Sequence, residues 1–555
     1  MNRNLRNRYR RLRWAILVLA LAIAPLAVYF TVQDHRRSNL YPEKLGTVHF
    51  ETSCAPGIAP KFDRALALLH SFEFPAAIDA FHVVLQEDRT CAIAYWGIAL
   101  SQWGNPFAGH RTPKMLHEGA AILQQGLSAG ARTERESDYI AAAAELYKNA
   151  DAVDESTRAL NYERAMQQLA QKYPNDFEAQ IFYALALAQN AQPGDKTYAR
   201  QLQAAAILEN ASQKQPDHPG VTHYLIHAYD TPSLAPRGLN AALRYASIAP
   251  SAPHALHMPS HIFTRVGDWQ SSIDANVASA KAARDQHSPG ELLHALDYLA
   301  YAYLQTAQDR SAKDVVEQMQ SAGRYVGGWR SYAPESLFRF FIRRASPAAA
   351  FALAATPARY VLEREAWTEA SALEVYTAPE APYTEAITRF ARALSFARSG
   401  DPASARREIA ELEKLHAKLA ANNDLYWAEQ VEIERLSASA WAARAEGKQE
   451  DALSLMRLAA EKEDRTEKSA VTPGPLKPAR ELLGELLLEF DQPQLALKEF
   501  EATLIQEPNR FRAIYGAAHA ARLAGDGGKA RAYYQRLLLV CRNAEVNRPE
   551  LQEAR

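Results

Sequence analysis

Short helix pairs that recur with one fixed period constrain this 555-residue chain more than any other feature. "ALKEF" begins at Ala496 and "ARAYY" at Ala530, which gives a period of roughly 34 residues, and both place a small residue four positions before an aromatic one. "AIDAF" at Ala77 is a third copy, and Pro216 and Pro250 are separated by the same period. Between these points apolar residues recur at spacings of three and four, and turn signals such as "YPND" and "QPDHP" separate them. The pattern predicts an all-α chain of antiparallel helix pairs.

The period and the small-to-aromatic spacing resemble those of tetratricopeptide repeats. The resemblance implies a right-handed α-solenoid in which each helix pair stacks on the next. We expect an N-terminal solenoid over 55–324, C-terminal repeats over 381–545 and a tail at 546–555. Residues 325–380 fit the repeat poorly and predict an irregular helical junction.

The N-terminus predicts a membrane anchor. Six arginines in the first thirteen residues precede "WAILVLALAIAPLAVYF", residues 14–30, which carries no charge. This indicates a basic cytoplasmic tail (1–13), a transmembrane signal anchor (14–30) and a linker (31–54). The body would lie in the periplasm, held to a bacterial inner membrane by a single pass. A secreted protein after signal cleavage is the alternative.

The net charge gives no indication of a nucleic-acid partner. Removing the six positive charges of the tail from a net charge of −1 leaves −7 for the rest of the chain.

The cysteines are few, and two of them fall at related repeat positions. If Ala77 takes the small position of a second helix, Cys54 and Cys91 lie at the same ends of neighbouring first helices. We therefore expect a Cys54–Cys91 disulfide, which suits an oxidising compartment. The alternative is that these cysteines and Cys541 are unpaired thiols.

Histidines are concentrated in one part of the chain, where eight of the sixteen lie between residues 218 and 294. His257 follows His223 by one repeat period and His261 follows His227 by the same interval, so the two pairs occupy equivalent positions of adjacent repeats. The three-four rule places them on one stripe of each first helix, which in tetratricopeptide repeats lines the concave groove. The predicted polar groove contains His223, His227, Asp230, His254, His257, His261, His294 and Asp297.

Other residues complete this predicted groove. Trp96, Trp103 and Tyr301 are expected to form its aromatic part, and His70 to lie near it. Pro259 removes a backbone donor between two of the histidines, so we expect a kink or a late helix start just before it.

Three functions suit such a groove. The first is binding of a transition metal (zinc, copper or iron) or of a small polar ligand, because imidazole suits these metals and Asp230 or Asp297 could act as ligand or orienting partner. The second is a scaffold that binds a protein or peptide in the groove or on the C-terminal repeats. The third is a metal-dependent enzyme. "HYLIH" lacks the glutamate of the HEXXH motif, and no glycine-rich elbow surrounds Ser260, which argues against two familiar hydrolase types.

Several blocks resemble a group of large bacterial tetratricopeptide proteins. The blocks include "TSCAPG", "TCAIAYWGIALS" and "HALDYLAYAYLQ", and the most specific runs from His223 to Trp269. The resemblance covers about residues 48–305 and implies the helical-repeat fold. It implies that the histidine block is typical of the group, and it indicates no particular activity or ligand.

Overall fold

The computed structural model describes residues 43–108, 111–327, 347–378 and 381–555. Two compact units are distinguished, Met1–Lys44 and Leu45–Arg555, and all the described helices belong to the second. The predicted basic tail and transmembrane segment, 1–30, lie outside the described residues. None of the helices in the described ranges combines the length and hydrophobicity needed to cross a bilayer.

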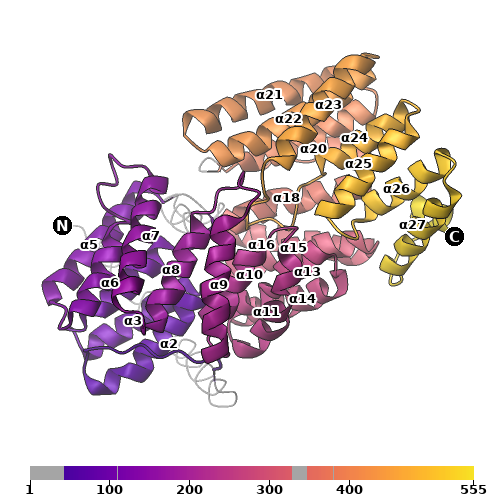
Figure 1. Ribbon diagram of the computed structural model, residues 1–555. Helices are drawn as coiled ribbons and strands as arrows, with labels where there is room; N and C mark the ends of the chain where they lie inside the picture. Colours follow the sequence, from indigo (N-terminus) through magenta and orange to yellow (C-terminus); the bar gives the residue numbers. More distant parts are fainter. Residues whose placement is uncertain (1–42, 109–110, 328–346, 379–380) are drawn as a thin grey trace, which may run out of the picture. The chain divides into compact units, whose positions relative to one another are not determined.

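The first part of the second unit consists of helices joined by short turns, as Figure 1 shows. The helices pack mainly against their neighbours in sequence, as the predicted helix pairs require. Their bounds are η1 Pro56–Ile58, α2 Ala59–His70, α3 Phe74–Glu87, α4 Ala92–Trp103, α5 Pro113–Ala129, α6 Glu134–Ala144, α7 Glu155–Lys172, α8 Phe177–Gln189, α9 Ala199–Lys214, α10 Pro219–Tyr229, α11 Ala235–Ile248, α12 Pro253–His257, α13 Pro259–Val266, α14 Trp269–Asp285, α15 Pro289–Gln305 and α16 Asp309–Gly327.

The remaining helices continue the same arrangement. They are α18 Pro347–Glu363, α19 Trp367–Ser371, α20 Tyr383–Arg398, α21 Pro402–Ala421, α22 Leu425–Ala445, α23 Gln449–Asp464, α24 Ala479–Glu489, α25 Pro493–Gln506, α26 Phe511–Leu523, α27 Gly527–Val540 and α28 Pro549–Ala554. No strand occurs in the ranges that the structure describes. The predicted all-α chain of tetratricopeptide-like helix pairs is confirmed for these residues.

Two segments outside the predicted repeats pack against the body. The end of the expected linker, residues 45–54, packs into the body, where Phe50 contacts the rings of Trp96 and Tyr139. The expected tail contains helix α28, whose Leu551 is buried. In both places, burial of apolar side chains stabilises the packing. The polar residues beside them in the sequence hide this apolar character.

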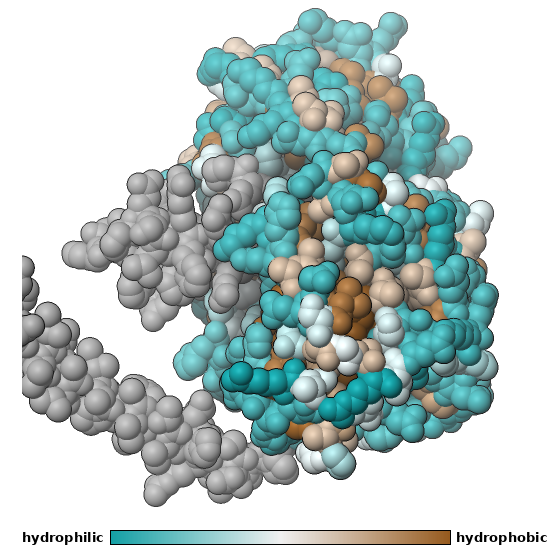
Figure 2. Space-filling view, turned by 90° about the vertical axis from the view of Figure 1, so that its left-hand side faces the viewer, coloured by the Kyte–Doolittle hydropathy of each residue, from teal (hydrophilic) through white to brown (hydrophobic). Residues whose placement is uncertain are grey.

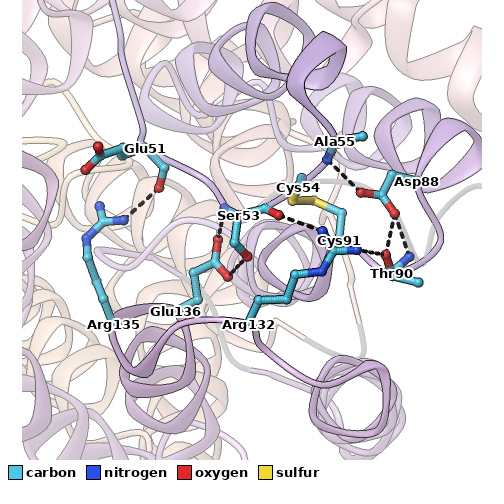
Figure 3. Close-up of a disulfide and its surroundings, with 10 residues drawn as sticks. All are labelled: Glu51, Ser53, Cys54, Ala55, Asp88, Thr90, Cys91, Arg132, Arg135 and Glu136. Atoms are coloured by element: carbon cyan, nitrogen blue, oxygen red, sulfur yellow. Dashed lines mark hydrogen bonds between the residues drawn. A yellow bond between two sulfur atoms is a disulfide. The ribbon is translucent and has the colours of Figure 1, made fainter.

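The predicted disulfide is present, and polar contacts surround it (Figure 3). Cys54 and Cys91 are joined with their Cα atoms 4.9 Å apart. Beside the bond, Arg132 donates to the Ser53 carbonyl at 2.9 Å, and the Ala55 amide donates to Asp88 at 2.9 Å. These contacts hold the incoming chain against the start of α4.

The turn between α13 and α14 packs against residues 508–509, and this contact links the histidine-rich repeats to the C-terminal ones. Gly267 ends α13 with φ +70°, and a Cβ there would lie 2.3 Å from the Pro508 carbonyl oxygen. Asn509 donates to the Gly267 carbonyl at 3.0 Å, and the Trp269 indole donates to the Asn509 carbonyl at 2.8 Å. Only glycine accommodates both this backbone conformation and this close approach.

The surface in Figure 2 is mainly hydrophilic, with smaller hydrophobic areas between the polar side chains. This is the usual character of a folded domain facing water.

Candidate metal centre

The repeat brings six histidines together as the same trio built twice. In each trio a pair four residues apart on one first helix is joined by a histidine from the start of the next first helix. One ring nitrogen from each member lies within 4.8 Å of the others in the same trio. The first trio is His223, His227 and His254, and the second trio is His257, His261 and His294.

The break predicted at Pro259 is confirmed and does not separate the second pair. Helix α12 ends at His257 and α13 begins at Pro259, with Met258 between them in α-helical conformation. Because Met258 preserves the helical direction, His257 and His261 still face each other, with their Nε2 atoms 3.1 Å apart.

In the first trio, acceptors hold the outward-facing nitrogens of His223 and His254. His223 donates from Nδ1 to the His70 carbonyl at 2.7 Å, which leaves a lone pair on its Nε2. That Nε2 lies 3.1 Å from Nε2 of His227. His254 uses Nδ1 to reach Glu291 at 3.1 Å.

In the second trio, acceptors hold two of the three rings in the same way. Asn276 donates its amide hydrogen to the Ser272 carbonyl at 2.7 Å, so its oxygen is free to accept from Nδ1 of His257, also at 2.7 Å. His261 donates from Nδ1 to Asp230 at 2.8 Å. Both Nδ1 atoms therefore carry the proton, and both Nε2 atoms carry a lone pair.

Two lone pairs that face each other at 3.1 Å repel unless a positive group lies between them. If that group were a proton, one of the two imidazoles would carry a positive charge, and burial opposes a charged ring. A metal ion meets the requirement directly. Ligand nitrogens about 2.0–2.1 Å from a tetrahedral ion are separated by about 3.3 Å, close to the observed spacing.

Two further ring nitrogens are buried without a hydrogen-bond partner. They are Nε2 of His254 and Nδ1 of His294, one from each trio. A buried polar atom without a partner costs free energy, and an ion at the site is one of its ordinary explanations. Each trio thus has a third ring nitrogen that an ion could bind.

Burial keeps most of these rings neutral. It lowers the pKa of His223, His227, His257 and His294 well below the ordinary value, with help from the neighbouring imidazoles. It also lowers the pKa of His261 to about 4, although Asp230 acts in the opposite direction. Neutral imidazole is the form that binds metals, so protons compete weakly for these five ligands.

His254 is the exception among the six rings. Burial alone would lower its pKa, but the carboxylates of Glu291 and Glu73 raise the pKa above its ordinary value.

A third cluster, His70, His218 and Glu178, also has metal-ligand spacing but is already satisfied. His218 accepts from the Val221 amide at Nδ1 and donates from Nε2 to Glu178 at 3.0 Å. His70 reaches the other oxygen of Glu178 at 2.9 Å. One carboxylate bridges two imidazoles, so no buried nitrogen is left needing an ion. We assign this cluster a structural role, in which His70 presents its carbonyl to His223.

Aromatic rings surround the first trio. The ring of Phe107 stacks on His227 with centroids 4.1 Å apart, and the ring of Phe72 lies 4.3 Å from that of His223. Phe72 stands in the turn after α2 with φ +56°, a conformation rare for a bulky residue. The turn thereby supplies both the His70 carbonyl and an apolar contact that excludes water.

A segment from the C-terminal repeats contacts the second trio's surroundings. We call Arg465–Pro478, between α23 and α24, the covering segment. Its Lys468 lies 2.9 Å from Asp230, the residue that accepts from His261. Its Thr472 carbonyl accepts from Tyr298 at 3.0 Å, and the Tyr298 ring packs against His257 and His261.

Asp230 contacts both His261 of the second trio and Lys468 of the covering segment. Burial would raise its pKa, but Lys468, the hydrogen bond from His261 and the nearby Arg265 together lower the pKa well below its ordinary value. The carboxylate is therefore ionised and acts only as an acceptor, which fixes the tautomer of His261.

The predicted open groove is filled by the chain itself. All six trio histidines are buried except His227, which is partly exposed. The structure brings six of the predicted stripe residues together, but the covering segment and the turn at Phe72 come from parts of the chain far from them in sequence. No local pattern indicates that such segments return to the stripe.

Four other predicted residues lie elsewhere. Asp297 is fully buried and accepts from Thr356 at 2.8 Å, on helix α18. Trp96 and Trp103 belong to the N-terminal hydrophobic core. The Tyr301 hydroxyl accepts from Arg510 at 3.0 Å. Their helical positions face neighbouring helices rather than the trios.

The sequence did not single out several residues that orient the trios. These residues are Glu73, Asn276, Glu291, Tyr298 and Lys468. Asn276 lies on the second helix of the repeat, and its polar position on a buried face is the one signal that could have found it.

Comparisons with known proteins give only distant similarities. No protein-family model matches the chain, and no curated protein does. A solved structure of the human IFIT1 dimer with m7Gppp-AAAA has 10% sequence identity and a TM-score of 0.39, over 88% of this chain and 96% of that one. Naa15/Naa10 bound to HypK-THB has 11% identity and a TM-score of 0.22, over 86% of this chain and 70% of that one. These TM-scores are too low to support an inference about ligand or partner.

The protein is therefore classed by its own architecture. It is an all-α protein of tetratricopeptide-like helix pairs with two buried histidine trios.

Proposed function

We propose that this protein binds a transition metal through its histidine trios. The observation that carries the proposal is the pair of Nε2 lone pairs of His257 and His261, which face each other at 3.1 Å in a buried site. The unpartnered nitrogens of His254 and His294 support it, since each would gain a bond to the ion. Three neutral imidazoles suit zinc, copper or iron.

The surrounding acceptors favour tight binding. The Nδ1 donors of His223, His254, His257 and His261 each meet an oxygen acceptor, the arrangement that orients histidine ligands in metalloproteins. The rings need little reorganisation, so little of the binding free energy is lost in ordering them.

The proposal includes an exported location. The Cys54–Cys91 disulfide supports it, because such bonds persist in oxidising compartments. The basic tail and apolar segment of the sequence support attachment to the inner membrane through residues 14–30.

Metal analysis of the full chain, purified without chelators or a His-tag, tests the proposal. We expect stoichiometric metal in the wild type and in His82→Ala, which removes an exposed histidine on α3. The double variant His257→Ala/His261→Ala should lose the metal of the second trio while keeping its helical circular dichroism. Wild-type protein with only trace metal after incubation with zinc and copper in turn would overturn the proposal.

A further inference from the structure

The two trios lie nearly as close to each other as the rings within each trio do. Inside the trios, ring centroids are 4.8 Å apart for His223 and His227 and 5.0 Å apart for His257 and His261. Between the trios, His227 and His261 are 6.0 Å apart, and His254 and His257 are 6.1 Å apart. Two ions, one per trio, would therefore share a single lining of imidazole rings.

We propose that the trios hold two metal ions as one dinuclear centre, with a small anion bound between them. This inference rests on the proposed metal binding and adds that the two sites act together. Three histidines leave a coordination position open on each ion, which an exogenous ligand can fill. Paired ions about 3.5–4 Å apart share one oxygen ligand in known two-metal sites.

Charge balance identifies the ligand as an anion. Six imidazole ligands would bring no negative charge to two divalent ions. Of the nearby carboxylates, Asp230 is already paired with Lys468 and Arg265, at 2.9 and 3.0 Å. Glu291 contacts the His254 ring at 3.1 Å, and Glu73 accepts from the His254 backbone amide at 3.2 Å, so neither is placed between the two trios. A small anion such as hydroxide would reduce the remaining positive charge in a buried site.

The repeated geometry explains why the two sites adjoin. Because His223 and His227 recur one repeat later as His257 and His261, stacking of the two repeats places the pairs side by side. His254 belongs to the first trio but lies on α12, the helix that also carries His257 of the second trio. The two trios are therefore positioned by the same backbone.

Copper(II) loading of the full chain tests the dinuclear centre. We expect two copper ions per chain by chemical analysis and an electron paramagnetic resonance intensity well below that of two isolated ions. A bridging anion couples the two unpaired electrons and removes most of the signal. The same protein loaded with zinc should also contain two ions per chain.

Variants of one trio separate this inference from metal binding itself. His223→Ala/His227→Ala leaves the second trio intact and should bind one copper ion with the full signal of a single ion. Azide should perturb the visible spectrum of the wild type differently from that of this variant, because only the wild type offers a bridging position.

Each remaining outcome decides one of the two claims. One copper ion per wild-type chain, or two ions with full signal, overturns the dinuclear centre and leaves metal binding standing. Absence of bound copper and zinc overturns metal binding as well. His82→Ala serves as the matched control and should behave as the wild type in every measurement.

Discussion

Lys468 lies 2.9 Å from Asp230, and Asp230 in turn accepts from His261 at 2.8 Å. A lysine from the C-terminal repeats thus neutralises the carboxylate that orients a histidine of the second trio. This buried ion pair is one of the contacts between the two halves of the chain, so changes in either half reach the candidate metal centre.

Replacing the orienting carboxylate should weaken metal binding. In Asp230→Asn, His261 loses an ionised acceptor, and we expect zinc affinity to fall about 10–100-fold. Zinc competition against a fluorescent chelator measures the change. Asp217→Asn removes an exposed carboxylate and serves as the control. Equal affinities in Asp230→Asn and the wild type would show that the carboxylate does not act through His261.

Removing the lysine should destabilise the metal-free protein most. Lys468→Met leaves Asp230 with fewer compensating groups, and we expect a loss of about 1–3 kcal/mol in the free energy of unfolding. Bound metal supplies positive charge nearby, so the loss should be smaller in the zinc-loaded protein. Urea denaturation with and without zinc measures both values, with Lys281→Met as an exposed control. Equal losses in the two states would contradict the coupling.

A cavity of about 120 Å³ beside the covering segment predicts a pH effect on stability. Glu434 and Glu463 line it, and burial, followed by repulsion from nearby carboxylates, raises the pKa of each to about 8. In the unfolded chain these groups ionise near 4.5. The folded state therefore holds protons that the unfolded state releases, and stability falls as pH rises from about 4.5 to about 8.

Glu434→Gln should remove part of that fall. Between pH 5 and pH 8.5, the free energy of unfolding should fall by about 1 kcal/mol more in the wild type than in the variant. The difference is this small because both side chains are partly exposed to water. Chemical denaturation at the two pH values measures it, and Glu450→Gln is the exposed control. A difference that does not change with pH would refute the assignment.

Breaking the disulfide should lower stability without affecting metal content. The bond closes a loop between positions 37 residues apart, which corresponds to about 3–4 kcal/mol in the chain-entropy model. Cys54→Ser/Cys91→Ser should therefore unfold at lower denaturant concentration than the wild type, while Cys541→Ser should change less. Lost metal binding in the folded double variant would show that the bond also positions the trios.

The helical repeat could be predicted because its evidence is local. Small and aromatic residues at fixed spacing indicate helix pairs, and a shift by one repeat relates His223 to His257 directly. The disulfide followed from the same register. The break before Pro259 followed from the missing backbone donor.

The burial of the candidate centre could not be predicted in the same way. Phe72 and Phe107 reach the histidines, and Lys468 reaches Asp230, from distant parts of the chain, and the irregular covering segment has no repeat register to place it. Asp297 shows a second limit of the repeat pattern as a guide to the site. It falls on the predicted stripe, but the junction helix α18 supplies Thr356 and Arg359, which draw it away from the trios.

The order of the chain has a consequence for how metal reaches the protein. His294 completes the second trio well before the ribosome makes Lys468 and the rest of the covering segment. During synthesis, the second trio can therefore be complete before the segment that covers it exists. In the folded chain the covering segment contacts Asp230 and Tyr298, so we expect the proposed site of the second trio to take up metal more slowly than it does before the C-terminal repeats have folded.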